Sequence, residues 1–193
     1  MAAPCPYFQA CGGCHYQHTT YENQLAIKKN ILLETLHRTA RLDWTGPVVT
    51  HPSPEFNYRN RSRLQVRASG EFTMGYFRFG SKEVLPVEVC PISSAAINRG
   101  IAAVWSAGRA GKIAAAVREI EFFATGDDRA MLLQVYVAGD SVDEDFARNI
   151  AEILSEAAPE IVGLIFCNRR GAGQEPGIDR EYGWTQLGVA GED

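Results

Sequence analysis

The chain has 193 residues, of which 46% are hydrophobic and 22% are charged, with a formal net charge of −4 at pH 7. These values are ordinary for a soluble globular protein, and the length fits one compact domain or one domain with a stapled extension. The five cysteines are too few for a disulfide scaffold and the apolar stretches are too short to span a membrane. Because residues 1–20 also lack a secretory signal, we expect a cytoplasmic protein without membrane contact. We also expect it to be a monomer.

Charge is distributed unevenly along the chain. Residues 59–82 carry six basic side chains and one acidic side chain, a net of +5, whereas residues 119–160 carry eleven acidic and two basic side chains, a net of −9. Two regions of opposite sign indicate that one face contacts a polyanion while the other does not. The acidic overall balance argues against indiscriminate binding of nucleic acid.

Three cysteines lie close together near the start of the chain, and a fourth lies far downstream. Cys5, Cys11 and Cys14 have the spacing Cys-x5-Cys-Gly-Gly-Cys, and Cys90 stands in Val-Cys-Pro-Ile. Four thiolates are the ligand set of an iron–sulfur cluster, and proline follows Cys5 and Cys90 as it follows the last cysteine of bacterial ferredoxin motifs. The two glycines allow the backbone to approach a bulky inorganic group. The pattern predicts an iron–sulfur site.

Two other interpretations of the cysteine pattern stay open, namely disulfides and a zinc site. Disulfides are disfavoured because a cytosolic location keeps thiols reduced. Zinc is the stronger rival, although structural zinc sites usually pair two short Cys-x2–4-Cys hooks and only one such hook is present. Its ligands would be drawn from Cys5, Cys11, Cys14, Cys90, His15 and His18. Cys167 lies in an apolar run and is interpreted as a small buried hydrophobic residue.

An amphipathic helix is expected over residues 20–40, after the cysteine loop. Thr19 and Glu22 have the spacing of a capping box, which satisfies two backbone amides at a helix start. Apolar side chains then recur at helical spacing at Tyr21, Leu25, Leu32 and Leu36. Three prolines between residues 47 and 54 indicate an extended connection. Residues 1–57 are therefore interpreted as the iron–sulfur loop, a helix and a linker.

Strand and helix patterns alternate in the rest of the chain. Strands are predicted over residues 58–69, 72–79, 83–89, 117–125, 131–138 and 161–167. A helix capped by Ser93 or Ser94 is predicted from the apolar stripe Ile97, Ile101, Val104 and Trp105. A later helix is predicted from the stripe Val142, Phe146, Ile150 and Leu154. With residues 83–89 set aside, the order from residue 72 matches the split βαβ, ferredoxin-like arrangement. We therefore predict an α+β fold with an antiparallel sheet and helices on one face.

Basic and aromatic side chains gather on the first two predicted strands. The arginines of the first strand alternate and so share a face, and guanidinium groups about 6.7 Å apart can bind phosphates bidentately. The aromatic residues of the next strand could stack on unpaired RNA bases. The structural alternative is solvated arginines and core aromatics. The predicted RNA contacts are Arg59, Arg61, Arg63, Arg67, Tyr76, Phe77 and Lys82.

These observations divide the chain into three parts, of which residues 1–57 are the first. Residues 58–168 are expected to form a central α+β domain that contacts RNA. After residue 168, glycine is frequent and large apolar residues are few. Residues 169–193 are interpreted as a flexible tail or as the start of a further domain.

The motifs resemble those of a known family. Residues 5–18, Cys-Pro-Tyr-Phe-Gln-Ala-Cys-Gly-Gly-Cys-His-Tyr-Gln-His, are similar to the cluster motif of the bacterial 23S ribosomal RNA (uracil-5-)-methyltransferases. The likeness continues through residues 21–25 with Lys28, then 58–61, 75–77 and 90–92. It implies a 4Fe–4S cluster on Cys5, Cys11, Cys14 and Cys90 within an RNA-contacting domain. Family members methylate the 5-position of a uridine with S-adenosylmethionine, through a cysteine nucleophile and a carboxylate base.

The chain also departs from the family pattern. It starts four residues before Cys5, where many members begin with an OB-like RNA-binding domain, and it lacks the glycine-rich cofactor loop and the catalytic cysteine and base motifs. We assign no catalytic residue. We expect the RNA-recognition region of a ribosomal RNA uridine-5-methyltransferase, inactive alone, with S-adenosylmethionine bound only in the full-length enzyme by a methyltransferase domain missing from this chain. A ferredoxin-type electron-transfer module and a zinc-stabilised RNA-binding module are the alternatives.

Overall fold

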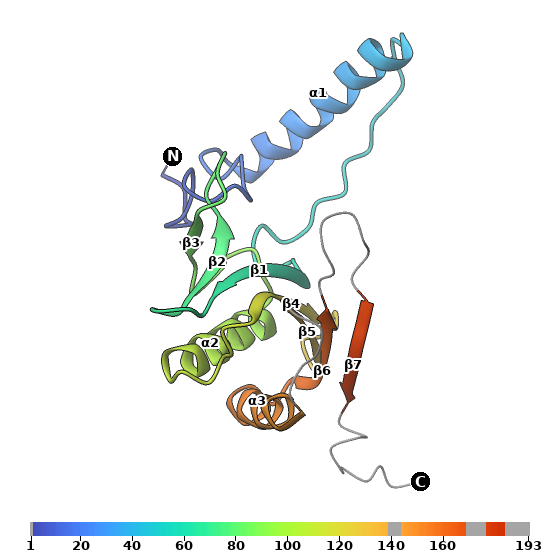
Figure 1. Ribbon diagram of the computed structural model, residues 1–193. Helices are drawn as coiled ribbons and strands as arrows, with labels where there is room; N and C mark the ends of the chain where they lie inside the picture. The colour runs from blue at the N-terminus through green and yellow to red at the C-terminus, as the bar shows by residue number, and fades with distance from the viewer. Residues whose placement is uncertain (1, 139–143, 169–176, 184–193) are drawn as a thin grey trace, which may run out of the picture.

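The fold is built on a seven-stranded sheet and three helices in the part of the chain that the structure describes (Figure 1). This computed structural model describes residues 2–138 and 144–168 and the backbone of 177–183. The strands are β1 Arg61–Arg67, β2 Thr73–Phe77, β3 Val84–Pro86, β4 Val117–Ala124, β5 Met131–Val137, β6 Ile161–Asn168 and β7 Gly177–Gly183. The helices are α1 Tyr21–Ala40, α2 Ala95–Arg109 and α3 Glu144–Ala157. The α+β class is therefore confirmed.

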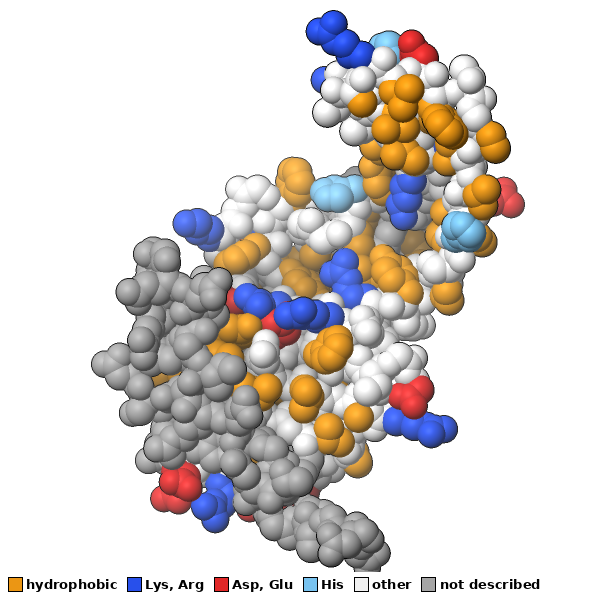
Figure 2. All heavy atoms as spheres, turned by 90° about the vertical axis from the view of Figure 1, so that its right-hand side faces the viewer, with side chains coloured by type: hydrophobic (Ala, Val, Ile, Leu, Met, Phe, Trp, Pro, Cys, Tyr) orange, Lys and Arg blue, Asp and Glu red, His pale blue; other side chains and the backbone are white. Residues whose placement is uncertain are grey.

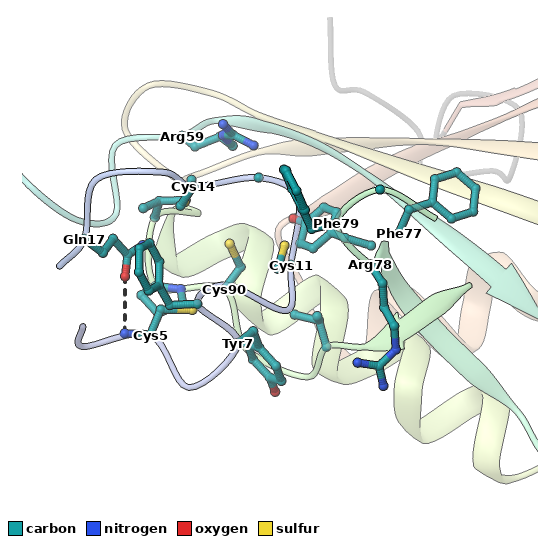
Figure 3. A pocket seen from close by; sticks show the side chains of 18 residues that line it. Cys5, Tyr7, Cys11, Cys14, Gln17, Arg59, Phe77, Arg78, Phe79 and Cys90 are labelled. Atoms are coloured by element: carbon teal, nitrogen blue, oxygen red, sulfur yellow. Dashed lines mark hydrogen bonds between the residues drawn. The ribbon is translucent and has the colours of Figure 1, made fainter. Parts of the chain in front are cut away.

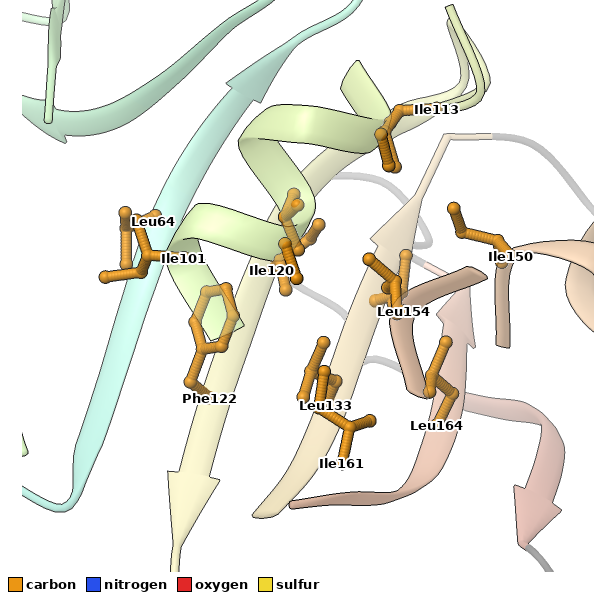
Figure 4. Packing of buried hydrophobic residues seen from close by; sticks show 14 of the residues in the cluster. Leu64, Ile101, Ile113, Ile120, Phe122, Leu133, Ile150, Leu154, Ile161 and Leu164 are labelled. Carbon is orange, nitrogen blue, oxygen red and sulfur yellow. The ribbon is translucent and has the colours of Figure 1, made fainter. Parts of the chain in front are cut away.

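The main core lies between one face of the sheet and the helices α2 and α3, which contact each other and β4 and β6. Alternate residues of β1 point into this core, so Leu64 and Val66 are fully buried while Arg61, Arg63 and Arg67 are exposed. Figure 4 shows Leu64 and Phe122 from the sheet beside Ile101 of α2. Burying each side chain of this kind contributes about 1.5–3 kcal/mol. The prediction that these two helices cover one face is confirmed.

The sheet is mixed, which corrects the expectation of an antiparallel sheet. Its strand order is β3-β2-β1-β4-β5-β6-β7, and every neighbouring pair is antiparallel except β5 and β6. The parallel pair arises because the chain returns through α3 between β5 and β6, and a helical crossover brings the next strand back in the same direction. This makes β5–α3–β6 a βαβ unit of adjacent strands.

The ferredoxin-like sheet order is also wrong. The predicted succession of strands and helices along the chain is present, but a split βαβ fold interleaves its two strand–helix–strand units. Here β1, rather than a strand of the second unit, lies between β2 and β4. The sequence pattern could not show this because β1 and β4 pair across more than fifty residues.

Helix α1 projects away from the sheet (Figure 1). It begins one residue later than the predicted capping box suggests, because the hydroxyl of Thr20 caps the helix and accepts from the amide of Asn23. None of its residues is buried by the described part of the chain, and Ile31 and Leu32 are 45% and 47% exposed. Figure 2 shows a band of apolar side chains on this projecting part. Neither α1 nor the other described helices combine the length and apolarity that crossing a membrane requires.

The remaining element bounds agree with the predictions to within a few residues. Ser94, one of the two proposed caps, accepts from the amide of Ile97 and starts α2. Strand β1 is shorter than predicted because Arg59 forms only an isolated bridge, with Ser93. Strand β7 was not predicted, since its residues lie in the glycine-rich region assigned to a tail or further domain. Val142 lies outside the described residues.

We predict that Gly75→Ala destabilises the protein. A Cβ at this position would lie 1.8 Å from the carbonyl oxygen of Leu85, so β3 would have to move away from β2. We expect a loss of about 3 kcal/mol in the free energy of unfolding, measured by urea denaturation, because overpacking against backbone is not easily relieved. Gly126→Ala is the matched control: a Cβ there meets nothing within 4 Å, and equal losses for both variants would contradict the prediction.

Candidate metal centre

The N-terminal cysteine loop is held against the end of β2 by backbone hydrogen bonds. Cys11 forms an antiparallel bridge with Arg78, and the amide of Phe79 donates to the carbonyl of Ala10 at 2.9 Å. Within the loop, the amide of Cys11 donates to the carbonyl of Tyr7 at 2.8 Å. The loop is therefore an extra segment added beside the sheet, and its position is set by β2.

Cys90 is brought to this loop by α2, through the side chain of Asn98. The Asn98 Oδ1 accepts from the amide of Cys90 at 2.8 Å, and its Nδ2 donates to the carbonyls of Cys90 at 3.1 Å and Ser93 at 3.2 Å. About two helix turns further on, Trp105 Nε1 donates to the carbonyl of Val87 at 2.9 Å. The segment before α2 is thus tied to the helix on both sides of the cysteine.

The four predicted ligands line one cavity of about 370 Å³, namely Cys5, Cys11, Cys14 and Cys90. Figure 3 shows them around the hollow, with Gln17 and Phe77 on opposite sides. Burial raises the pKa of the Cys5 thiol, and the thiols of Cys90, Cys14 and Cys11 raise it further. Burial also raises the pKa of the Cys11 thiol. The structure therefore brings together sulfurs that the sequence separates by as many as 85 positions.

The cysteines do not form a ready site for a single metal ion among the residues that the structure describes. In the described part of the chain, no three side chains of His, Cys, Asp or Glu are gathered tightly enough to hold one metal ion. Cys167 lies on β6, does not line the cavity and is 4% exposed. Its interpretation as a buried hydrophobic residue is confirmed.

The rim of the cavity carries basic and aromatic side chains. Arg59, Phe77, Arg78 and Phe79 all line it. Phe79 is 68% exposed and meets the ring of His15 edge-on, with the ring centroids 6.2 Å apart. Arg59 is held through its backbone, because its amide donates to the carbonyl of Ile92 at 2.8 Å. Two of the predicted RNA contacts, Arg59 and Phe77, thus lie at the mouth of the cysteine site.

Tyr76 has a different environment from that expected of a base-stacking residue. Its hydroxyl hydrogen-bonds the hydroxyl of Ser62 on β1. Burial raises the pKa of Tyr76, and the neighbouring Cys90 thiol raises it further. Its side chain also lines the cavity. The structure therefore places Tyr76 among the groups that surround a cysteine.

Arg61 and Arg63 share the exposed face of β1, as the alternation predicts, but both are paired with Glu121. Arg61 Nε donates to Glu121 Oε1 at 2.6 Å, and Arg63 Nη2 donates to Oε2 at 2.7 Å. The Arg63 guanidinium also lies 4.6 Å from the centroid of the Tyr136 ring. Figure 2 shows basic and acidic side chains in contact near the middle of one face. The basic and acidic regions of the sequence therefore meet here and are not confined to separate faces.

The two other predicted RNA contacts lie apart from the cavity. Arg67, at the end of β1, is exposed and donates to the carbonyl of Val66 at 3.0 Å. Lys82 is exposed in the turn between β2 and β3. The predicted set therefore does not form one continuous row.

Two residues of the site were not predicted from the sequence. Gln17 accepts from the amide of Cys5 at 3.2 Å, and Asn98 holds Cys90 in the manner described above. Gln17 could have been suspected because it follows Cys14 by three residues, within the likeness to the cluster motif. Asn98 gives no such signal, because its neighbours are ordinary residues of an amphipathic helix.

Comparison with known proteins agrees with the resemblance drawn from the motifs. No protein-family model matches the chain. An uncharacterised RNA methyltransferase of Aquifex aeolicus is 43% identical over 97 residues, which is 50% of this chain and 22% of that protein. The 23S rRNA (uracil(1939)-C(5))-methyltransferase RlmD of Pseudomonas entomophila is 34% identical over 96 residues, 47% of this chain and 21% of that protein. The resemblance to the RNA uracil-5-methyltransferases is confirmed over about half of the chain.

A solved structure shows the same fold over most of the chain. The tRNA (uracil-54, C5)-methyltransferase of Pyrococcus abyssi, in complex with S-adenosyl-L-homocysteine, has a TM-score of 0.62 at 18% identity. The match covers 93% of this chain and 42% of that protein. The chain thus spans well under half of this neighbour and about a fifth of the sequence relatives.

We predict that Glu121 contributes stability that is lost in acid. Burial alone would raise the pKa of this carboxyl, but hydrogen bonds from Arg61 and Arg63 lower it below its ordinary value. A lowered native pKa means that the contribution is present at neutral pH and disappears as the pH falls through that pKa. At pH 7 we expect Glu121→Gln to be about 1–2 kcal/mol less stable than the wild type by urea denaturation.

The difference should narrow below pH 4.5, the ordinary value for the group. Glu83→Gln is the control, because its pair with Arg78 is exposed and should be worth at most about 1 kcal/mol. A difference between Glu121→Gln and the wild type that stays constant from pH 7 to pH 3 would contradict this assignment.

Proposed function

We propose that this chain is the iron–sulfur-bearing, RNA-recognition region of an S-adenosylmethionine-dependent RNA uridine-5-methyltransferase. The observation that carries the proposal is the convergence of Cys90 with the N-terminal cysteines on a cavity that Arg59 and Phe77 also line. The named relatives over about half of the chain support the reaction class. None of them supports the electron-transfer alternative.

The cavity fits a 4Fe–4S cluster better than zinc. Four thiols line one cavity of about 370 Å³, and no three of the described side chains are gathered as ligands of one ion, whereas a cubane places its irons toward four separate cysteines. Burial raises the pKa of the Cys5 and Cys11 thiols, although backbone hydrogen bonds at Tyr7 and Gly13 act in the opposite direction. A positively charged iron core would stabilise the thiolates further. A Cβ at Gly13 would lie 3.5 Å from Cys11 Sγ and so take up space beside this ligand.

We propose that the cluster ties the N-terminal loop to the segment before α2. Crosslinking Cys14 to Cys90 closes a loop of 76 residues, and by analogy with a disulfide this removes roughly 4 kcal/mol of unfolded-state entropy. This crosslink also fixes the end of β2, because Arg78 there forms a bridge with Cys11 of the loop. A structural role of this kind needs no change of oxidation state.

RNA contact is proposed for the rim of the cavity. Arg59 supplies a charge for a phosphate, and the exposed rings of Phe77 and Phe79 can stack on unpaired bases. Ribosomal RNA is the substrate class named for the Pseudomonas relative. We propose that these 193 residues supply recognition and that S-adenosylmethionine binds in a separate methyltransferase domain of the longer protein.

We predict that the anaerobically prepared chain contains about four irons and four sulfides, with the broad visible absorbance of a cubane. Cys90→Ser should lose most of both, because the fourth ligand is removed, while Cys167→Ser should keep them, since Cys167 does not line the cavity. Iron and acid-labile sulfide analysis checks this. Stoichiometric zinc without sulfide in the wild type would show that the proposed cluster is wrong.

We predict that Arg59→Ala weakens binding of single-stranded, uridine-containing RNA. Loss of one phosphate contact should reduce the dependence of log Kd on log salt by about 1 and weaken binding similarly for different sequences. Fluorescence anisotropy at several salt concentrations measures both. Arg129→Ala is the matched control, because Arg129 is exposed in the β4–β5 turn and does not line the cavity. Equal salt dependence for Arg59→Ala and the wild type would remove Arg59 from the interface.

A further inference from the structure

Gln17 is a buried amide beside the first cysteine of the cavity. Only 8% of its surface is exposed, and its Oε1 accepts from the amide of Cys5 at 3.2 Å. An N–H group can donate to the amide oxygen and not to the amide nitrogen, so this contact determines which way the side-chain amide is turned. Its Nε2 is therefore left with two N–H donors to satisfy elsewhere.

Within the described residues, Gln17 Nε2 has no hydrogen-bond partner. Burying an amide whose donors are unused is unfavourable, and such groups in native proteins usually have a partner. Gln17 lines the cavity with all four cysteines, so the group that fills this cavity is within reach as the missing acceptor. Figure 3 shows Gln17 beside Cys5 at the edge of the hollow.

We propose that Gln17 is a positioning residue whose side-chain N–H donates to a sulfur of the cysteine-bound cluster. The inference rests on the cluster assigned under the proposed function and adds a specific donor to it. Sulfur atoms of an iron–sulfur cluster accept hydrogen bonds, and such bonds are one of the determinants of its reduction potential. The reduced cluster carries one more negative charge, so a donor favours reduction and raises the potential.

A direct test is electron–nuclear double resonance on the reduced cluster in the full 193-residue chain, labelled with side-chain ¹⁵N glutamine. We expect a ¹⁵N coupling and an exchangeable-proton coupling in the wild type, both absent from Gln17→Met. Gln9→Met is the matched control, because it makes the same substitution in the same loop at an exposed glutamine, and it should keep both couplings.

The reduction potential gives a second readout. We expect Gln17→Met to lower the equilibrium constant for reduction about fivefold, which is about 40 mV at 59 mV per tenfold change for one electron. Gln9→Met should match the wild type. Because the wild-type spectrum already tests the contact, the inference stays testable even if Gln17→Met fails to fold.

The outcomes separate the two proposals. No ¹⁵N coupling in a wild-type protein that holds four irons and four sulfides would overturn the role of Gln17 and leave the cluster in place; the amide would then face the neighbouring hollow of about 310 Å³, which Gln17 also lines. A coupling that persists in Gln17→Met would overturn it too. A wild-type protein without iron or sulfide would overturn the proposed function itself.

Discussion

The contact on which the site depends joins two segments that are far apart in the sequence. One is the cysteine loop, which bridges Arg78 at the end of β2, and the other is the segment around Cys90, which Asn98 holds against α2. Each hydrogen bond contributes about 1 kcal/mol, which is little against the entropy of closing so long a loop. The packing of α2 on the sheet must therefore supply the remaining stability, because it fixes the positions of Asn98 and Trp105.

Electrostatics divides the basic side chains into two groups. Glu121 is 6% exposed and forms ion pairs with both Arg61 and Arg63. These two guanidinium groups are therefore held against the sheet. Arg59 lies just before β1, where the chain leaves the sheet and pairs with Ser93. This change of backbone environment, and not the alternation along one strand, directs Arg59 to the cavity. Charge counted along the sequence does not show this division.

Local signals predicted the elements well because each depends on near neighbours. The cap at Ser94 and the alternation of buried Leu64 and Val66 with polar residues of β1 are of this kind, and both are present. The sheet order was missed because the pairing of β1 with β4 is decided by packing across more than fifty residues. The hydrogen bond of Tyr76 was missed for a related reason: its partner Ser62 lies on another strand, so its environment depends on register.

The sequence predicted the four cysteines that line the cavity, but not the groups around them. Cysteine spacing carries information because sulfur chemistry restricts what four thiols can do. An amide such as Gln17 or Asn98 has no such restriction, and only its contacts with Cys5 and Cys90 show its role.

The geometry also links the proposed metal site to the proposed RNA contacts. Cys11 and Phe79 are held by the same short ladder, in which the Cys11–Arg78 bridge is followed by the bond from Phe79 to Ala10. Movement of the cysteine would therefore move the exposed ring. Arg59 is similarly tied to Ile92, two residues from Cys90. The proposed ligands and the proposed RNA contacts are thus held by the same backbone, so any group that stabilises the sulfurs would also order the surface proposed to contact RNA.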